Sequence, residues 1–164
     1  MQLGLTIPFP DELLPKLWAW VNGRRGAQAN DFGVGEFPYF AAWFHDQVAF
    51  SAGLCLDGAI AGCVVVVRDP GDPTLGIVHF STDRALWGRR NTRPVIAQAL
   101  QAAFEQGGFG KLAGHIFHDN RLAIRLCREI GAVVEGHLRK HTLVGGERVD
   151  MVVFGLLKED LCLS

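Results

Sequence analysis

The stretch Phe50–Thr82, FSAGLCLDGAIAGCVVVVRDPGDPTLGIVHFST, determines the fold class of this chain. It contains three strand-like runs: Phe50–Leu56, Ile60–Arg68 and Thr74–Thr82. Asp57 and Gly58, between the first two runs, form a two-residue turn of the type that hairpins prefer. The run Val64–Val67 is β-branched throughout, which is typical of a strand buried on both faces. These features predict an antiparallel meander of three strands.

The chain downstream alternates between helix and strand. Apolar residues at helical spacing predict a helix over Thr92–Gln106, with Thr92 as its N-cap, and a second helix over Leu122–Ile130. Further strands are expected at Lys111–Phe117, Val133–Thr142 and Arg148–Leu157. This order is that of a mixed α/β fold with one βαβ-like crossover.

The first third of the chain has a helical and aromatic character. Asp11–Val21 follows a proline-rich entry and carries leucines and a tryptophan at helical spacing. The polar, glycine-rich stretch Asn22–Pro38 predicts a loop. An aromatic cluster then predicts the start of a second helix and a part of the core. The members of this cluster are Phe37, Tyr39, Phe40, Trp43 and Phe44.

The composition is that of an ordinary globular protein, because hydrophobic residues make up 49% of the 164 positions and charged residues 20%. With a formal net charge of -1, the chain offers no broad basic surface for nucleic acid or for an anionic membrane. No apolar run reaches the length of a membrane span, and the first residues lack the pattern of a secretory signal. The four cysteines form no CxxC pair, which favours free thiols. We therefore expect a cytoplasmic protein without a metal site.

The carboxy-terminal part of the chain resembles a known family. Residues 120–131, NRLAIRLCREIG, are similar to the asparagine-to-glycine segment of the GNAT N-acetyltransferases. The continuation, EGHLRK at 135–140 and GGERVDM at 145–151, resembles the closing hairpin of the ribosomal-protein N-terminal acetyltransferase branch. The resemblance implies a GNAT-like α/β (α+β) fold, in which helices flank a mixed, mostly antiparallel sheet of six to seven strands.

The same resemblance implies acetyl-CoA as the acyl donor and an amine as the acceptor, and it allows a homodimer. On this basis we expect a single domain over residues 1–164. Within it, residues 1–48 are expected to form a variable helical region on the substrate side, and residues 49–160 the cofactor-binding core.

In that family, a loop with two glycines opens a helix and binds the cofactor's pyrophosphate through backbone amides and the helix dipole. The residues here for which the resemblance implies this contact are Trp87, Gly88, Arg89, Arg90, Asn91 and Thr92. Arg90 stands where the second glycine is expected, so a guanidinium would pair with phosphate in place of a close backbone approach. The alternative is a solvated basic loop that no longer binds the cofactor. Asn120 occupies a family position that contacts the cofactor, although an asparagine there caps helices equally well.

Acyl transfer to an amine requires a base for the amine proton, donors for the developing oxyanion and, for the departing thiolate, an acid. We predict His79 as the base, because a histidine titrates near neutrality and this one shares a strand face with Ile77 and Ser81. Ser81 joins it in the predicted catalytic group, and His118 is the alternative base. The family's acid is a tyrosine at the position of Cys127, so the resemblance assigns that role to a thiol that is otherwise ordinary core.

Two other functions remain open at this point. The departures at Arg90 and Cys127 favour a catalytically degenerate GNAT-like module that serves as a protein-interaction domain. Modification of a nucleic-acid base ranks last, because the charge balance offers no phosphate-binding surface.

Overall fold

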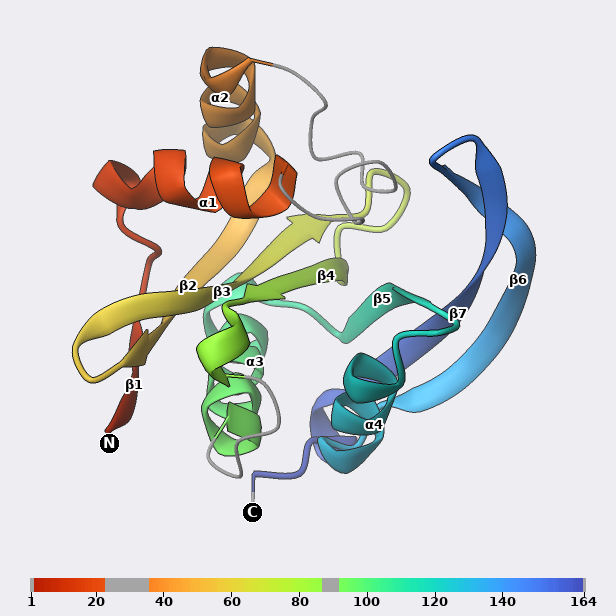
Figure 1. Cartoon of the computed structure of the whole chain (residues 1–164). Coiled ribbons are helices and arrows are strands. Elements are labelled where there is room, and N and C mark those ends of the chain that lie inside the picture. Colours follow the sequence, from red (N-terminus) through yellow and green to blue (C-terminus); the bar gives the residue numbers. More distant parts are fainter. Residues whose placement is uncertain (1, 23–35, 87–91, 164) are drawn as a thin grey trace.

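The computed structural model describes residues 2–22, 36–86 and 92–163. Its centre is a seven-stranded sheet in the order β1-β2-β3-β4-β5-β7-β6 (Figure 1). The strands are β1 (Leu3–Thr6), β2 (Val48–Leu56), β3 (Ala59–Arg68), β4 (Leu75–Thr82), β5 (Lys111–Phe117), β6 (Val133–Val144) and β7 (Glu147–Leu157). Neighbouring strands run antiparallel, except that β4 and β5 are parallel. The predicted mixed α/β fold with a mostly antiparallel sheet is confirmed.

Helices cover both faces of this sheet. The described helices are α1 (Leu14–Asn22), α2 (Phe37–Gln47), α3 (Thr92–Gly107) and α4 (Arg121–Glu129). Short 3-10 turns occur at Asp11–Leu13, Arg84–Leu86 and Lys158–Asp160. Helices α1 and α2 pack on one face and α3 and α4 on the other (Figure 1). Among the helices that the structure describes, none combines the length and the apolar character that crossing a membrane requires.

Each face of the sheet buries its own apolar core. In β3, Val64 and Val66 are each 0% exposed and pack with residues of α3 and α4. Their neighbours Cys63 and Val65 are buried on the other face, with residues of α1 and α2. The β-branched run therefore lies in a strand that is buried on both faces, as predicted.

The two hairpins turn where glycine or aspartate tolerates a positive φ. Asp57 and Gly58 have φ values of 50° and 80°, and Gly145 and Gly146 have φ values of 59° and 87°. Positive φ at both central residues belongs to the tight turn whose twist matches that of the flanking strands. These turns set the register of β2 with β3 and of β6 with β7.

Two expectations near element ends require correction. The region expected to be helical at the start of the chain also contains β1, which pairs antiparallel with β2 from Leu3↔Leu56 to Thr6↔Gly53. A strand of 4 residues carries too short a pattern to be recognised in the sequence. Thr92 is the first residue of α3 rather than its N-cap, and its hydroxyl donates a hydrogen bond to the carbonyl oxygen of Leu86 at 2.8 Å.

The parallel pairing between β4 and β5 is short. Within the described chain their ladder runs from Leu75↔Lys111 to Ile77↔Ala113. Beyond it, β4 stays paired with β3 and β5 stays paired with β7, so the two strands separate (Figure 1). The sheet therefore opens near its centre.

Candidate functional site

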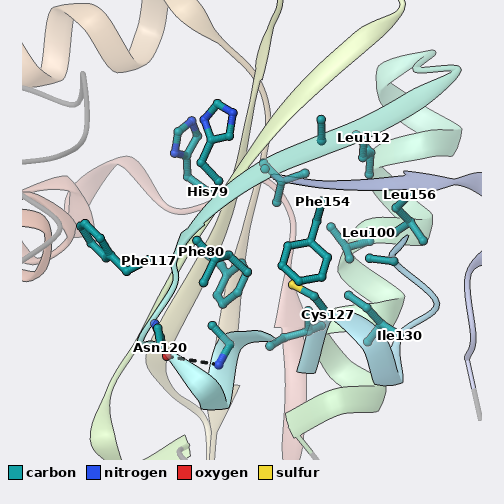
Figure 2. Close-up of a pocket in the computed structure, with 18 of the residues that line it drawn as sticks. His79, Phe80, Leu100, Leu112, Phe117, Asn120, Cys127, Ile130, Phe154 and Leu156 are labelled. Carbon is teal, nitrogen blue, oxygen red and sulfur yellow. Dashed lines mark hydrogen bonds between the residues drawn. The ribbon is translucent and has the colours of Figure 1, made fainter. Parts of the chain in front are cut away.

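The opening between β4 and β5 leads into a cavity of about 780 Å³. The two strands line it with Val78–Ser81 on one side and Leu112–Phe117 on the other. Val21 of α1 contributes to its wall, and so does Leu100 of α3 on the opposite face of the sheet. The cavity thus reaches both faces of the sheet, and Figure 2 shows the residues gathered around it.

Strand β4 presents a different surface to each half of the cavity. His79 and Ser81 lie directly opposite Val65 and Cys63 in the ladder with β3, so they share the face that α1 and α2 cover. Phe80 lies opposite Val64 and faces α3 and α4. The predicted common face of His79 and Ser81 is therefore confirmed by the register. One half of the cavity is polar at this strand, and the other half is apolar.

The environment of His79 disfavours the charged imidazole. Burial and, to a lesser extent, repulsion from His115 together lower the pKa of His79 to about 3. The desolvation cost of an imidazolium is the larger of the two causes. His79 is consequently neutral across the physiological pH range, in the form that accepts a proton.

Two further histidines, His115 of β5 and His141 of β6, lie close to each other. Their ring centroids are 5.7 Å apart, and His115 lines the cavity. The buried residues Leu112 and Ile116 of β5 face α3 and α4, so alternation places His115 on the opposite face, with His79. Among the described residues, no group of three or more His, Cys, Asp or Glu has an arrangement that holds a metal ion.

Ser81 carries a polar atom whose hydrogen bonding the described protein leaves incomplete. Its Oγ is buried and has no hydrogen-bond partner among the described residues, and the residue lines the cavity. Leaving a buried hydroxyl unsatisfied costs about 1–3 kcal/mol. Such atoms occur where a ligand supplies the partner. Ser81 is therefore suited to contact a polar group of a bound molecule.

Cys127 of α4 lies in the apolar half of the cavity, close to Phe154 and Ile130 (Figure 2). Its side chain is buried, with 7% of the residue exposed. Burial raises the pKa of the Cys127 thiol to about 12. The thiol consequently retains its proton at neutral pH and is a weak acid.

Asn120 and His118 stand in the connection between β5 and α4. The Asn120 side-chain oxygen accepts a hydrogen bond from the Ala123 amide at 3.2 Å, which makes Asn120 the N-cap of α4 (Figure 2). Asn120 also lines the cavity, so one residue can both cap the helix and contact a ligand. His118 is exposed, and its Nδ1 lies 3.3 Å from the carbonyl oxygen of Asp150. It does not belong to the described cavity wall, unlike His79.

The predicted pyrophosphate residues fall largely outside the described part of the chain. Trp87–Asn91 lie there, and Thr92 is the first residue of α3. Arg84, which precedes them, lines the cavity. A basic residue and the start of a helix therefore flank the predicted loop.

His115 and Phe117 are among the cavity-wall residues that sequence reasoning did not predict as part of a site. Both stand on the same face of Lys111–Phe117, and their alternation with Leu112 and Ile116 was the available signal. Alternation assigns a face, but it does not reveal that this face adjoins His79, which depends on the parallel pairing of β4 with β5.

Comparison with known proteins adds an independent line of evidence. Residues 15–132 match the model of the acetyltransferase (GNAT) family. Mutant forms of the spermidine/spermine N-acetyltransferase SpeG from Vibrio cholerae share the fold, with a TM-score of 0.77 and 18% identity over 96% of this chain and 95% of that chain. An acetyltransferase of the GNAT family from Streptococcus pneumoniae gives a TM-score of 0.74 and 19% identity over 95% of this chain and 99% of that chain. No curated protein matches the chain in sequence.

Proposed function

The chain belongs to the acetyltransferase (GNAT) family, and from that premise we propose that it is an N-acyltransferase that moves an acetyl group from acetyl-CoA to a primary amine. The observation that carries this proposal is the cavity between β4 and β5, with His79 and the buried hydroxyl of Ser81 on its wall. A cavity that reaches both faces of a sheet lets two ligands meet from opposite sides, which transfer between them requires.

The residues around the apolar half of the cavity fit acetyl-CoA. Ile96, Leu100 and Phe154 form walls suited to a flexible thioester arm. Helix α3 begins directly after the basic segment 87–91, and a helix N-terminus favours phosphate. We propose that residues Trp87–Thr92 bind the pyrophosphate of acetyl-CoA and that Asn120 contacts its thioester arm. When bound, the cofactor supplies an activated carbonyl carbon.

The polar half of the cavity then receives the amine. The amine attacks as the free base, and the neutral imidazole of His79 then accepts the proton that the newly bonded nitrogen carries, directly or through a water molecule. Because the pKa of His79 is lowered to about 3, it passes this proton on rather than holding it. Ser81 Oγ accepts a hydrogen bond from an amine N–H and holds the nitrogen toward the other face of the sheet. These two groups position a nucleophile that has lost its proton, which is the form that attacks a carbonyl.

Cys127 is our proposed proton donor to the departing sulfur. The thiol is protonated at neutral pH, as a donor must be, because burial raises its pKa to about 12. The same shift makes transfer to a thiolate of ordinary pKa, about 8.5, unfavourable. The contribution of Cys127 is therefore small, and the reaction depends chiefly on how the amine and the thioester are placed.

The branch of the family and the division of the chain between acceptor and cofactor are proposed from the sequence. The segments 135–140 and 145–151 are the ground for proposing kinship with the ribosomal-protein N-terminal acetyltransferase branch. Spermidine is the acceptor named for one structural neighbour, which at 18% identity shares the fold. We propose one domain over 1–164, in which 1–48 lies on the acceptor side and 49–160 holds the cofactor.

Ligand-dependent unfolding tests the proposal. Acetyl-CoA at 100 times its Kd should raise the free energy of unfolding by about 2.7 kcal/mol. Arg90→Glu should abolish the effect, whereas Arg139→Glu, at an exposed site on β6, is the matched charge change and should preserve it. His79→Ala should preserve the stabilisation and abolish turnover. If acetyl-CoA, propionyl-CoA and free CoA all fail to stabilise the protein, the interaction module is the better assignment.

A further inference from the structure

Strand β6 contains an irregular segment, Arg139–His141, within its pairing with β7. The register places the three residues of this segment opposite the single residue Asp150 of β7, between the pairs Leu138↔Met151 and Thr142↔Val149. An excess of residues on one strand is a β-bulge, which bends the strand and re-aims its side chains. The hairpin of β6 and β7 is accordingly curved (Figure 1). We call residues 139–141 the β6 bulge.

Two side chains of β7 hold the shape of the β6 bulge. The Oδ1 atom of Asp150 accepts a hydrogen bond from the Lys140 amide at 2.7 Å. Arg148 Nη1 donates to the carbonyl oxygens of Lys140 and His141, at 3.1 Å and 3.4 Å. Lys140 has a φ of 48°, which a residue other than glycine adopts only where its surroundings stabilise it. The conformation of the β6 bulge therefore depends on Asp150 and Arg148.

The β6 bulge changes the face of the sheet to which His141 belongs. Leu138 and Thr142 share the face of His79, since their partners on β7 alternate with the residues that face α3 and α4. Alternation counted from either of them assigns His141 to the opposite face. The ring centroid of His141 nevertheless lies 5.7 Å from that of His115, which is on the face of His79. The bulge therefore turns His141 toward the polar half of the cavity.

His141 lies at the rim of the cavity rather than deep within it. His115 lines the cavity and is exposed, so it marks the rim of the polar half. His141 is exposed as well, and its ring extends this rim outward from β5. An imidazole offers one nitrogen that donates and one that accepts a hydrogen bond. His141 is therefore placed to bind a polar group of a molecule that occupies the polar half.

We propose that His141 binds the amine acceptor at the rim of the polar half, and that Asp150 and Arg148 are positioning residues that act by holding the β6 bulge. The proposal rests on the proposed N-acyltransferase function and adds a residue of β6 to its acceptor site. It is carried by the register of β6 with β7, by the hydrogen bonds to the bulge, and by the contact between the rings of His115 and His141. The proposed cofactor side is the opposite face of the sheet, so changes in the bulge should affect the amine and not acetyl-CoA.

Steady-state kinetics separate these two substrates. CoA release is measured with 2-phenylethylamine, glycinamide and spermidine, and the variants are compared on the amine that the parent turns over best. His141→Ala should raise the KM of this amine about tenfold, as expected for one lost hydrogen bond, and leave the KM of acetyl-CoA unchanged. Asp150→Ala should raise the KM of the amine by the same factor, because the bulge no longer holds His141 beside His115.

A double variant tests whether Asp150 acts through His141. In the His141→Ala protein, the further change Asp150→Ala should cause no additional rise in the KM of the amine. Asp150→Asn retains an oxygen that accepts the Lys140 amide, so it should keep the KM of the parent. Asp72→Ala is the matched control, because it removes a carboxylate that accepts the Thr74 amide at 2.8 Å in the exposed turn between β3 and β4. It should leave both KM values unchanged.

The outcomes distinguish the proposal from the function on which it rests. An unchanged KM of the amine in His141→Ala overturns the proposal, and so does an additional rise in the double variant. An equal rise in the KM of the amine and of acetyl-CoA in Asp150→Ala contradicts a positioning role. If Asp150→Ala does not fold, Arg148→Ala takes its place in the cycle with the same expected results. A parent that does not bind acetyl-CoA, or that acetylates none of the three amines, contradicts the proposed function itself.

Discussion

Ser81 places a buried hydroxyl on the cavity wall, and no described residue satisfies it. Ser81→Ala removes the unsatisfied oxygen without burying a new polar group. We expect the free energy of unfolding to stay the same or to rise by about 1 kcal/mol. We expect kcat/KM to fall about tenfold, because the hydrogen bond that holds the amine is lost. Urea denaturation and CoA release measure the two quantities on one sample. Reduced stability would contradict the assignment, since it would mean that Oγ already has a partner within the protein.

His79 links its burial to the pH dependence of stability. Its pKa falls from about 6.5 in the unfolded chain to about 3 in the folded one. Between these two pH values, His79 is protonated in the unfolded chain and neutral in the folded one. The free energy of unfolding therefore decreases as the pH falls from about 6.5 to about 3. We expect His79→Gln to lose less stability than the parent over that window, and to show the same stability above pH 7.5 apart from a constant offset. Urea denaturation at a series of pH values measures the difference. Parallel curves for the two proteins would contradict the lowered pKa.

The histidine and the serine also show what a sequence reveals at the scale of a residue. Alternation along β4 is sufficient to place His79 and Ser81 on one face. The depth of their burial and the approach of His115 from β5 depend on a pairing between segments that are far apart in the chain. Neither follows from local pattern, and for that reason His115 escaped prediction.

At the scale of the element, Asn120 combines a cap with a position on the cavity wall. Its side chain accepts the Ala123 amide at the start of α4. Asn120→Ala should lower the free energy of unfolding by about 1 kcal/mol, because the cap is lost. Asn120→Asp keeps the cap and adds a negative charge, so stability should be retained while acetyl-CoA binds more weakly. Thermal unfolding and calorimetric titration separate the two effects. Unchanged affinity in Asn120→Asp would leave Asn120 with the capping role alone.

Elements with a strong local pattern were predicted closely, and those defined by distant partners were not. Lys111–Phe117 was expected with the bounds that β5 shows, because turn residues end it on both sides. Leu3–Thr6 was missed because its strand character comes from pairing with β2, more than forty positions away. The opening between β4 and β5 is of the same kind, since it results from ladders to β3 and β7 rather than from residues at the opening.

At the scale of the whole molecule, the sheet couples two cores. One core lies under α1 and α2 and the other under α3 and α4, and residues of β3 contribute to both. Loss of either core exposes one face of the same central strands, so neither is expected to persist alone. We therefore expect the two cores to unfold together, as the proposed single domain over residues 1–164 requires.

Tryptophan fluorescence provides a local probe of that coupling. The described tryptophans, Trp18, Trp20 and Trp43, all belong to α1 and α2, whereas Leu100 is 4% exposed in the opposite core. Leu100→Ala should lower the free energy of unfolding by about 2–5 kcal/mol through the cavity it leaves. If the two cores unfold together, tryptophan fluorescence and far-UV circular dichroism should shift to the same lower urea midpoint. Leu17→Ala, at a residue 2% exposed in the other core, is the matched change and should also shift both signals equally. A Leu100→Ala protein whose fluorescence midpoint stays at that of the parent while its circular dichroism midpoint falls would divide the chain into two independent units.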